Sequence, residues 1–132
     1  MEIVAALFVE SIDFRKAEGD ATRIDITGAF FSTAVPSYPA VLTPHLVVLV
    51  RAAPGTEGNA TLETVFVRDD GEEIGRNGQS FFVEPGKFGY RLVKGELDFP
   101  GPGTVEARCT IIESGSAVTV PLTALPNAAP TA

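Results

Sequence analysis

The sequence has little of the chemistry from which catalytic and metal sites are usually built. Its 132 residues include a single cysteine, Cys109, and a single histidine, His45. One cysteine cannot form an internal disulfide, and neither a Cys-x-x-Cys pair nor a Cys/His set with zinc-ligand spacing is present. The sequence also lacks a phosphate-binding loop, a G-x-S-x-G motif and a dinucleotide fingerprint. We therefore expect a protein that is not an enzyme and needs no cofactor.

Basic side chains are scarce as well. Lysine and arginine number 10 against 17 aspartates and glutamates, which gives a formal net charge of -7. Nucleic acids and anionic membranes are bound through clustered Lys and Arg, so we expect neither as a partner. The apolar stretch 3–9 is preceded by Glu2 instead of the basic residues of a secretion signal. No run reaches the ~20 apolar residues of a membrane helix, and the sequence predicts a cytoplasmic protein.

Turn-forming residues, in contrast, are plentiful. The chain has 13 glycines and 10 prolines, with a hydrophobic fraction of 45%. These values are typical of a globular chain with many turns, long enough to fold without a disulfide or a metal. We expect one domain over residues 1–125. The segment 126–132 has no packing pattern, which predicts a flexible C-terminal tail.

Short apolar runs separated by turn residues predict about eight β-strands and no amphipathic helix. The predicted strands span 2–10, 22–33, 46–53, 60–68, 73–84, 88–99, 104–112 and 117–122. This pattern favours an all-β fold, an antiparallel two-sheet β-sandwich of the immunoglobulin-like or jelly-roll-like kind. A small β-barrel is the alternative.

Two hairpins are predicted in the middle of the chain. Pro54-Gly55 and Gly58-Asn59 lie between the runs 46–53 and 60–68, which predicts that these two strands pair with each other. Farther along, Asp69-Asp70-Gly71-Glu72 has the Asp-Gly pair that favours a type I′ turn.

Two other segments are predicted to be connections. Residues 11–21 are mostly polar and indicate a surface loop with one helical turn at 14–17. Residues 34–44 contain three prolines, which remove backbone donors and predict an extended crossover between sheets. Gly28 interrupts the strand between them and indicates a bulge or a close approach of the backbone.

Several segments, in this order, resemble an uncharacterised family of small bacterial cytoplasmic β-sandwich proteins. They are Ala6-Leu-Phe-Val-Glu10 followed by Arg15, the strand 24–31, Tyr38-Pro-Ala-Val-Leu42 leading into 46–50, and Val67-Arg-Asp-Asp-Gly71. The resemblance extends to about Leu125 and rests on pattern and order, with no catalytic signature. It implies a compact sandwich and supplies no activity, cofactor or site residue. Family members often have a longer glycine-containing turn where this chain has Ala17-Glu-Gly-Asp20.

The polar candidates for a site are few. Asp69, Asp70, Glu72 and Glu73 gather four carboxylates that could bind calcium. They lack the spacing of a calcium loop, and acidic turns are common because Asp and Gly suit turn geometry, so a solvated turn is favoured. For His45 the sequence offers no nucleophile or orienting partner. Cys109 alternates with apolar residues, which predicts a core position.

Two strands are apolar on both faces, and this is the most informative feature of the sequence. In the strand 2–10, Val4 and Phe8 lie opposite Ile3, Leu7 and Val9, and in the strand 46–53, Val47 and Leu49 lie opposite Leu46, Val48 and Val50. A second apolar face must be covered, either by the crossover or the loop at Phe14, or by another protein molecule.

We therefore expect a non-enzymatic structural or protein-interaction module. It would self-associate or join a larger assembly through an apolar outer sheet face at Val4, Phe8, Val47 and Leu49. The alternative is a sandwich that binds a small ligand or a carbohydrate, with calcium at the acidic hairpin 69–73.

Overall fold

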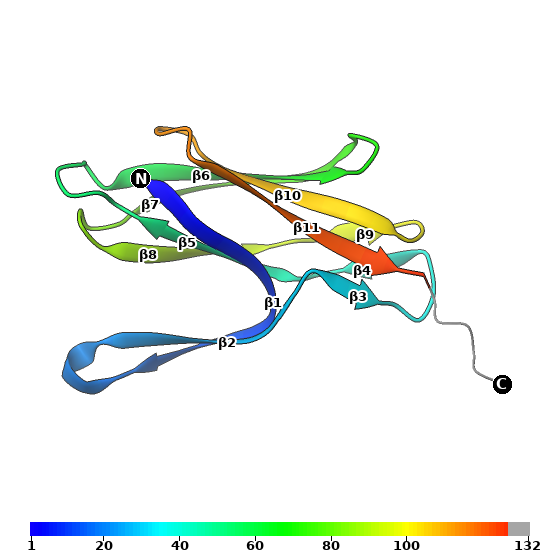
Figure 1. Cartoon of the computed structure of the whole chain (residues 1–132), viewed down its shortest axis with the longest axis horizontal. Helices are drawn as coiled ribbons and strands as arrows, with labels where there is room; N and C mark the ends of the chain where they lie inside the picture. The colour runs from blue at the N-terminus through cyan, green and yellow to red at the C-terminus, as the bar shows by residue number, and fades with distance from the viewer. Residues whose placement is uncertain (127–132) are drawn as a thin grey trace.

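The computed structural model of the chain describes residues 1–126 and is all-β (Figure 1). Its elements are β1 (Glu2–Lys16), the 3₁₀ turn η1 (Glu18–Asp20), β2 (Thr22–Phe30), β3 (Ser32–Ala34), β4 (Ala40–Leu42), β5 (His45–Arg51), β6 (Asn59–Arg68), β7 (Glu73–Phe82), β8 (Phe88–Lys94), β9 (Leu97–Phe99), β10 (Gly103–Ile111) and β11 (Ala117–Leu125). The predicted strands 22–33 and 88–99 are each divided in two, and β4 forms within the crossover. The predicted tail lies outside the described residues except for Pro126.

The strands are divided among three sheets in a β-sandwich-like arrangement. One sheet has the order β2-β1-β5-β8, a second has the order β3-β11-β10-β6-β7, and β4 pairs with β9. All neighbours are antiparallel except β3 and β11, which run parallel. No helix within residues 1–126 is long and apolar enough to cross a membrane.

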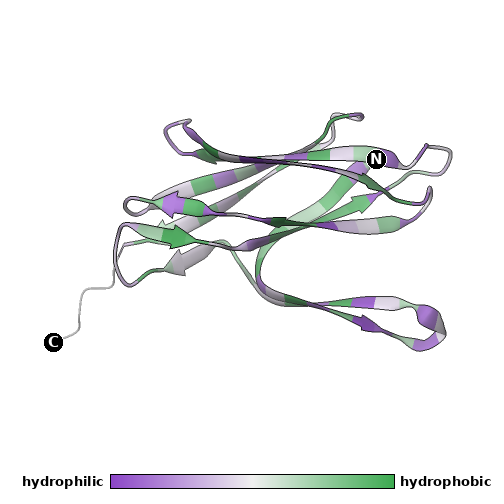
Figure 2. Cartoon of the chain, turned by 180° about the vertical axis from the view of Figure 1, so that it is seen from behind, coloured by the Kyte–Doolittle hydropathy of each residue, from purple (hydrophilic) through white to green (hydrophobic). Residues whose placement is uncertain are grey.

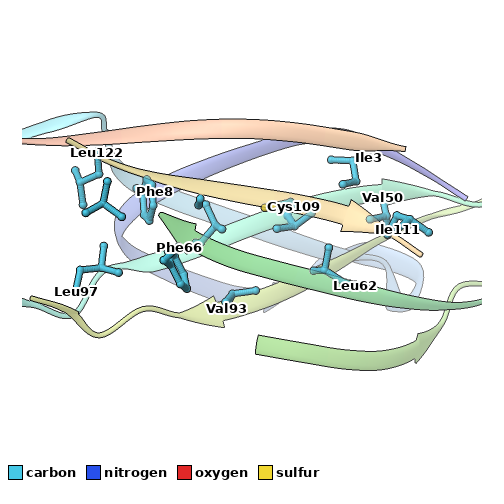
Figure 3. Close-up of a cluster of buried hydrophobic side chains, with 14 of the residues drawn as sticks. Ile3, Phe8, Val50, Leu62, Phe66, Val93, Leu97, Cys109, Ile111 and Leu122 are labelled. Carbon is cyan, nitrogen blue, oxygen red and sulfur yellow. The ribbon is translucent and has the colours of Figure 1, made fainter. Parts of the chain in front are cut away.

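The hydrophobic core lies between the two larger sheets (Figure 3). Along β6 and β10, alternate residues are buried, as expected for strands with one face on a core. Phe8, Leu46 and Val48 enter this core from the four-stranded sheet, and Phe66 and Ile111 enter it from the five-stranded sheet. The core therefore fixes the inner face of each sheet.

The predicted hairpin between the runs 46–53 and 60–68 is wrong. β5 pairs with β1 and β8, whereas β6 pairs with β7 and β10 in the other sheet. The segment between β5 and β6 therefore passes from one sheet to the other. The physical reason is that β5 is buried on both faces, whereas β6 buries alternate residues against one core, so the two strands need different numbers of covering layers.

The hairpin of β6 and β7 is present, but its turn is not of type I′. The Gly71 N–H donates to the Arg68 carbonyl over 3.0 Å, and Gly71 has a φ of +91°. Asp69 and Asp70 do not have positive φ, whereas a type I′ turn requires it at both central residues. A register shift between Phe66 and Val67 leaves Ile74 as an extra residue, which is a bulge in β7 just beyond the turn.

The proline-rich crossover is confirmed. It leads from β3, at the end of the five-stranded sheet, through β4 to β5 in the four-stranded sheet. Within 34–44, only Ala34 at the end of β3 and the three residues of β4 are in strands, because proline has no N–H to donate to a ladder.

Candidate functional site

A β-bulge near the start of β1 changes which of its side chains share a face. The pairing of β1 with β5 shifts between Ile3 and Ala5, which leaves Val4 as the extra residue. The alternation is reversed beyond the bulge, so Phe8 points into the core and is fully buried. The prediction that Phe8 lies on the outer face is therefore wrong. Val4 remains 49% exposed.

The other two predicted interface residues lie on the face of β5 that points away from the core. We call this side of β1, β5 and β8 the outer face, and Leu7, Val47, Leu49 and Tyr90 belong to it. Val47 is 1% exposed and Leu49 is half-buried, although neither belongs to the core cluster. A part of the chain other than the five-stranded sheet must therefore cover the outer face.

That cover is a hairpin arm, formed by residues 11–27 of β1 and β2. Figure 1 shows β1 curling at its middle so that the arm returns below β5 and β8. The predicted loop with a helical turn at 14–17 is wrong, since β1 continues to Lys16 and η1 closes the hairpin. Of the covers considered for the outer face, the segment around Phe14 reaches it, since Phe14 stacks on Tyr90.

The arm has one apolar side and one polar side. Ile12 pairs with Ile26 and Phe14 with Ile24, so these four side chains share a face. The ring of Phe14 stacks on Tyr90, with centroids 4.9 Å apart and an interplanar angle of 28°. The apolar side of the arm therefore faces the outer face of the sheet.

The polar side of the arm carries charges of both signs. Asp13 pairs with Asp25 across the hairpin, and Arg15 pairs with Arg23. The Arg15 Nε donates to the Asp25 carboxylate over 2.6 Å, which raises the pKa of the guanidinium above its ordinary value. Both side chains are largely exposed, so this ion pair adds little stability and mainly marks the solvent side.

The arm leaves the sheet at a bend formed by Glu10 and Gly28. Gly28 has a φ of +66°, which L-residues with a side chain rarely adopt. A Cβ atom added there would lie 2.5 Å from Cδ of Glu10, so the Glu10 side chain crosses directly over this glycine. The sequence predicted a bulge or a close approach of the backbone at Gly28, and what lies close to it in the structure is the Glu10 side chain.

The arm does not close completely onto the sheet. A cleft of about 260 Å³ remains, lined by Thr22, Ile24, Leu49, Phe88, Gly89 and Tyr90. None of these side chains carries a charge at neutral pH. Phe88, in this lining, is 69% exposed, and Leu7, elsewhere on the outer face, is 41% exposed. Figure 2 shows hydrophobic residues where β1 bends and hydrophilic residues at the tip of the arm.

Sequence reasoning missed Phe88, Tyr90 and the arm as parts of this site. Ile12 and Phe14 before Gly19, and Ile24 and Ile26 after it, alternate with polar residues. This pattern is typical of a hairpin. The charged residues between them concealed it, because they suggested a loop.

The acidic turn does not gather its carboxylates. Asp70 accepts a hydrogen bond from the Glu72 N–H over 2.8 Å, and Glu72 lies 3.5 Å from the Arg68 guanidinium. Arg76 donates to Glu73 over 2.6 Å, which lowers the pKa of that carboxyl. Within residues 1–126, no three acidic, histidine or cysteine side chains are placed to share a metal ion. Of the calcium candidates Asp69, Asp70, Glu72 and Glu73, the last three are thus engaged in hydrogen bonds or ion pairs within the hairpin.

His45 is exposed at the start of β5 and lines a second cavity of about 310 Å³. The cavity also contains Glu10, Thr33 and Thr43, but no serine or aspartate. In the part of the chain that the structure describes, no hydrogen bond orients the His45 imidazole as a catalytic base would require.

Cys109 lies in the core, as predicted, with no exposed surface. Burial raises the pKa of its thiol to about 11, and the Thr64 hydroxyl lies 4.0 Å from Sγ. The thiol is therefore neutral at physiological pH and has the properties of a small hydrophobic side chain.

No model of a known protein family matches the chain, and a search of curated proteins gives no match. Function must therefore be inferred from the geometry itself.

Proposed function

We propose that the chain is a non-enzymatic protein-interaction module that forms a homodimer through its outer face and arm. The observation that carries this proposal is the uncharged cleft between them, flanked by Phe88 and Tyr90, which are 69% and 40% exposed. Exposed aromatic side chains beside a partly buried apolar layer are typical of protein interfaces.

A second copy of the chain is the partner that the charge distribution favours. Each chain carries a net charge of -7, so two copies repel each other over most of their surface. An uncharged patch is where such copies can come together without placing like charges in contact. The cleft provides that patch, and β8 beside it is the end strand of its sheet.

The arm and the body would have different roles in this dimer. In our proposal the body is an immunoglobulin-like or jelly-roll-like two-sheet sandwich that holds the outer face rigid. The arm moves about the bend at Gly28 and closes on the partner. The contact is isologous, because the same outer face and arm are present on both copies.

The proposal is tested by measuring mass in solution. Size-exclusion chromatography with light scattering, over a range of protein concentrations, should give twice the 13.9 kDa chain mass for the natural sequence. Phe88→Asp should give the single-chain mass, because it places a carboxylate in the apolar contact. Phe31→Asp is the matched control, since Phe31 is also 69% exposed but does not line the cleft.

The two variants distinguish a specific interface from nonspecific hydrophobic association. Retention of the dimer in Phe31→Asp, with its loss in Phe88→Asp, supports the outer face as the interface. A natural chain that stays monomeric at every concentration contradicts the proposal. The same mass in solution for Phe31→Asp and Phe88→Asp contradicts the proposal as well.

A further inference from the structure

The cavity beside His45 carries an inference that is independent of the dimer. It lies where several parts of the chain converge, since its lining comes from β1, β2, β3, β4, β5 and β11. Its apolar lining includes Val9, Phe30, Leu42 and Leu122, and Val9 and Leu122 are fully buried. The volume of about 310 Å³ is at the lower end of the range for small-molecule sites.

Glu10 is the acidic side chain in this lining, which includes no lysine, arginine or aspartate. Glu63, Glu73 and Glu106 lie within ion-pair distance of an arginine, whereas Glu18, Glu57 and Glu96, like Glu10, lie within that distance of no described cation but do not line this cavity. Glu10 forms neither an ion pair nor a side-chain hydrogen bond with any described residue. Its side chain crosses Gly28, where only the absence of a Cβ atom leaves room for it.

An unpaired carboxylate beside an apolar lining is complementary to a cation on an alkyl chain. We propose that this cavity binds an alkylammonium group, with the ammonium at Glu10 and the alkyl chain along Val9, Leu42 and Leu122. The aromatic ring of Phe30, which also lines the cavity, suits a neighbouring cation. The net charge of -7 attracts cations to the site and disfavours carboxylates and phosphates.

An alkylammonium group has two sources in a cell, namely a free small amine and the side chain of a lysine in another protein. Both share the chemistry that Glu10 would recognise. The experiment therefore uses n-hexylammonium as the free amine and Nα-acetyl-lysine methylamide as the lysine side chain, with hexanoate and hexan-1-ol as probes of the alkyl chain alone.

The test is a titration of the isotope-labelled full chain followed by amide chemical shifts. We expect n-hexylammonium to shift the amides of Val9, Thr33 and Leu122, with hexanoate and hexan-1-ol shifting them far less. Glu10→Gln should weaken the Kd about ten- to a hundredfold, because the neutral amide can still accept a hydrogen bond but has lost the charge that strengthens a bond to an ammonium. Glu18→Gln, at the tip of the arm, removes the same charge outside the cavity and should leave the Kd unchanged.

The outcomes separate the two sources and leave the proposal open to refutation. Binding of the lysine derivative with a similar Kd supports a protein partner, and binding of hexylammonium alone supports a small amine. Equal binding of hexan-1-ol, an unchanged Kd in Glu10→Gln, or the absence of any shift at the cavity overturns the proposal. None of these results depends on the oligomeric state, which is measured separately.

Discussion

The two faces of β5 are alike in sequence and differ in what covers them. On the inner face, Leu46, Val48 and Val50 are fully buried against the five-stranded sheet. On the outer face, Val47 is buried but Leu49 is only half-buried under the arm. Apolar composition on both faces thus indicates that both faces are covered. It does not indicate how completely each cover buries the side chains.

The covers differ in how they are held. The inner cover is a sheet of five hydrogen-bonded strands. The outer cover is a two-stranded ribbon attached to the body at one bend, and such a ribbon is marginally stable without packing. The outer layer is therefore expected to open more readily than the core, and the dimer that we propose uses this difference.

The largest difference between the two faces should be in the free energy of unfolding, when a leucine on each face of β5 is replaced by alanine. Leu46→Ala removes fully buried methyl groups from the core and should lower the free energy of unfolding by about 3 kcal/mol. Leu49→Ala, three residues farther along the same strand, should cost about 1 kcal/mol because the side chain is only half-buried. Urea denaturation of both variants measures the difference.

Equal costs at these two positions would show that the arm covers the outer face as firmly as the sheet covers the inner one. The measurement is made at low protein concentration, so that dimer formation does not add to the cost at Leu49.

Much of the fold could be predicted from local patterns. The alternation in residues 104–112 placed Cys109 on a core face, and the prolines of 34–44 indicated the crossover. Pairing between strands could not be predicted in the same way. The segments 46–53 and 60–68 have a turn between them, yet they belong to different sheets. In the structure β5 lies between β1 and β8, and β6 lies between β10 and β7.

The candidate site was predicted only in part. Val47 and Leu49 were placed on the correct face, because β5 is regular and strict alternation holds, although Val47 is 1% exposed and is therefore not accessible to a partner in this structure. Phe8 was placed on the wrong face, since a single extra residue at Val4 reverses the alternation and no residue there marks a bulge. The partner surface on the arm depends on a bend at Gly28 that brings distant residues together, and that geometry is not local.

A substitution at the bend tests how the arm is held on the outer face. Gly28→Ala places a side chain at a φ of +66° and displaces Glu10, so it should cost about 1–2 kcal/mol and change the angle of the arm. Gly19→Ala is the control, because Gly19 has a similar φ of +71° in open space at the tip. Denaturation gives the cost, and the amide shift of Tyr90 reports the position of the arm.

Both glycine variants should be destabilised, but Gly28→Ala alone should shift the Tyr90 amide. The same shift in Gly19→Ala, or none in either variant, would mean that the bend does not set how the arm meets the sheet. The outer layer would then be held by its own packing alone.

The smallest effect concerns the aromatic contact between Phe14 and Tyr90, which joins the arm to the outer face. A double-mutant cycle with Phe14→Leu and Tyr90→Leu should give a coupling energy of about 1 kcal/mol, the usual value for a stacked aromatic pair. Phe14→Leu with Phe31→Leu is the control cycle and should give none. A coupling near zero for Phe14 and Tyr90 would mean that the arm spends much of its time away from the sheet, which would leave the whole outer face free for the second copy.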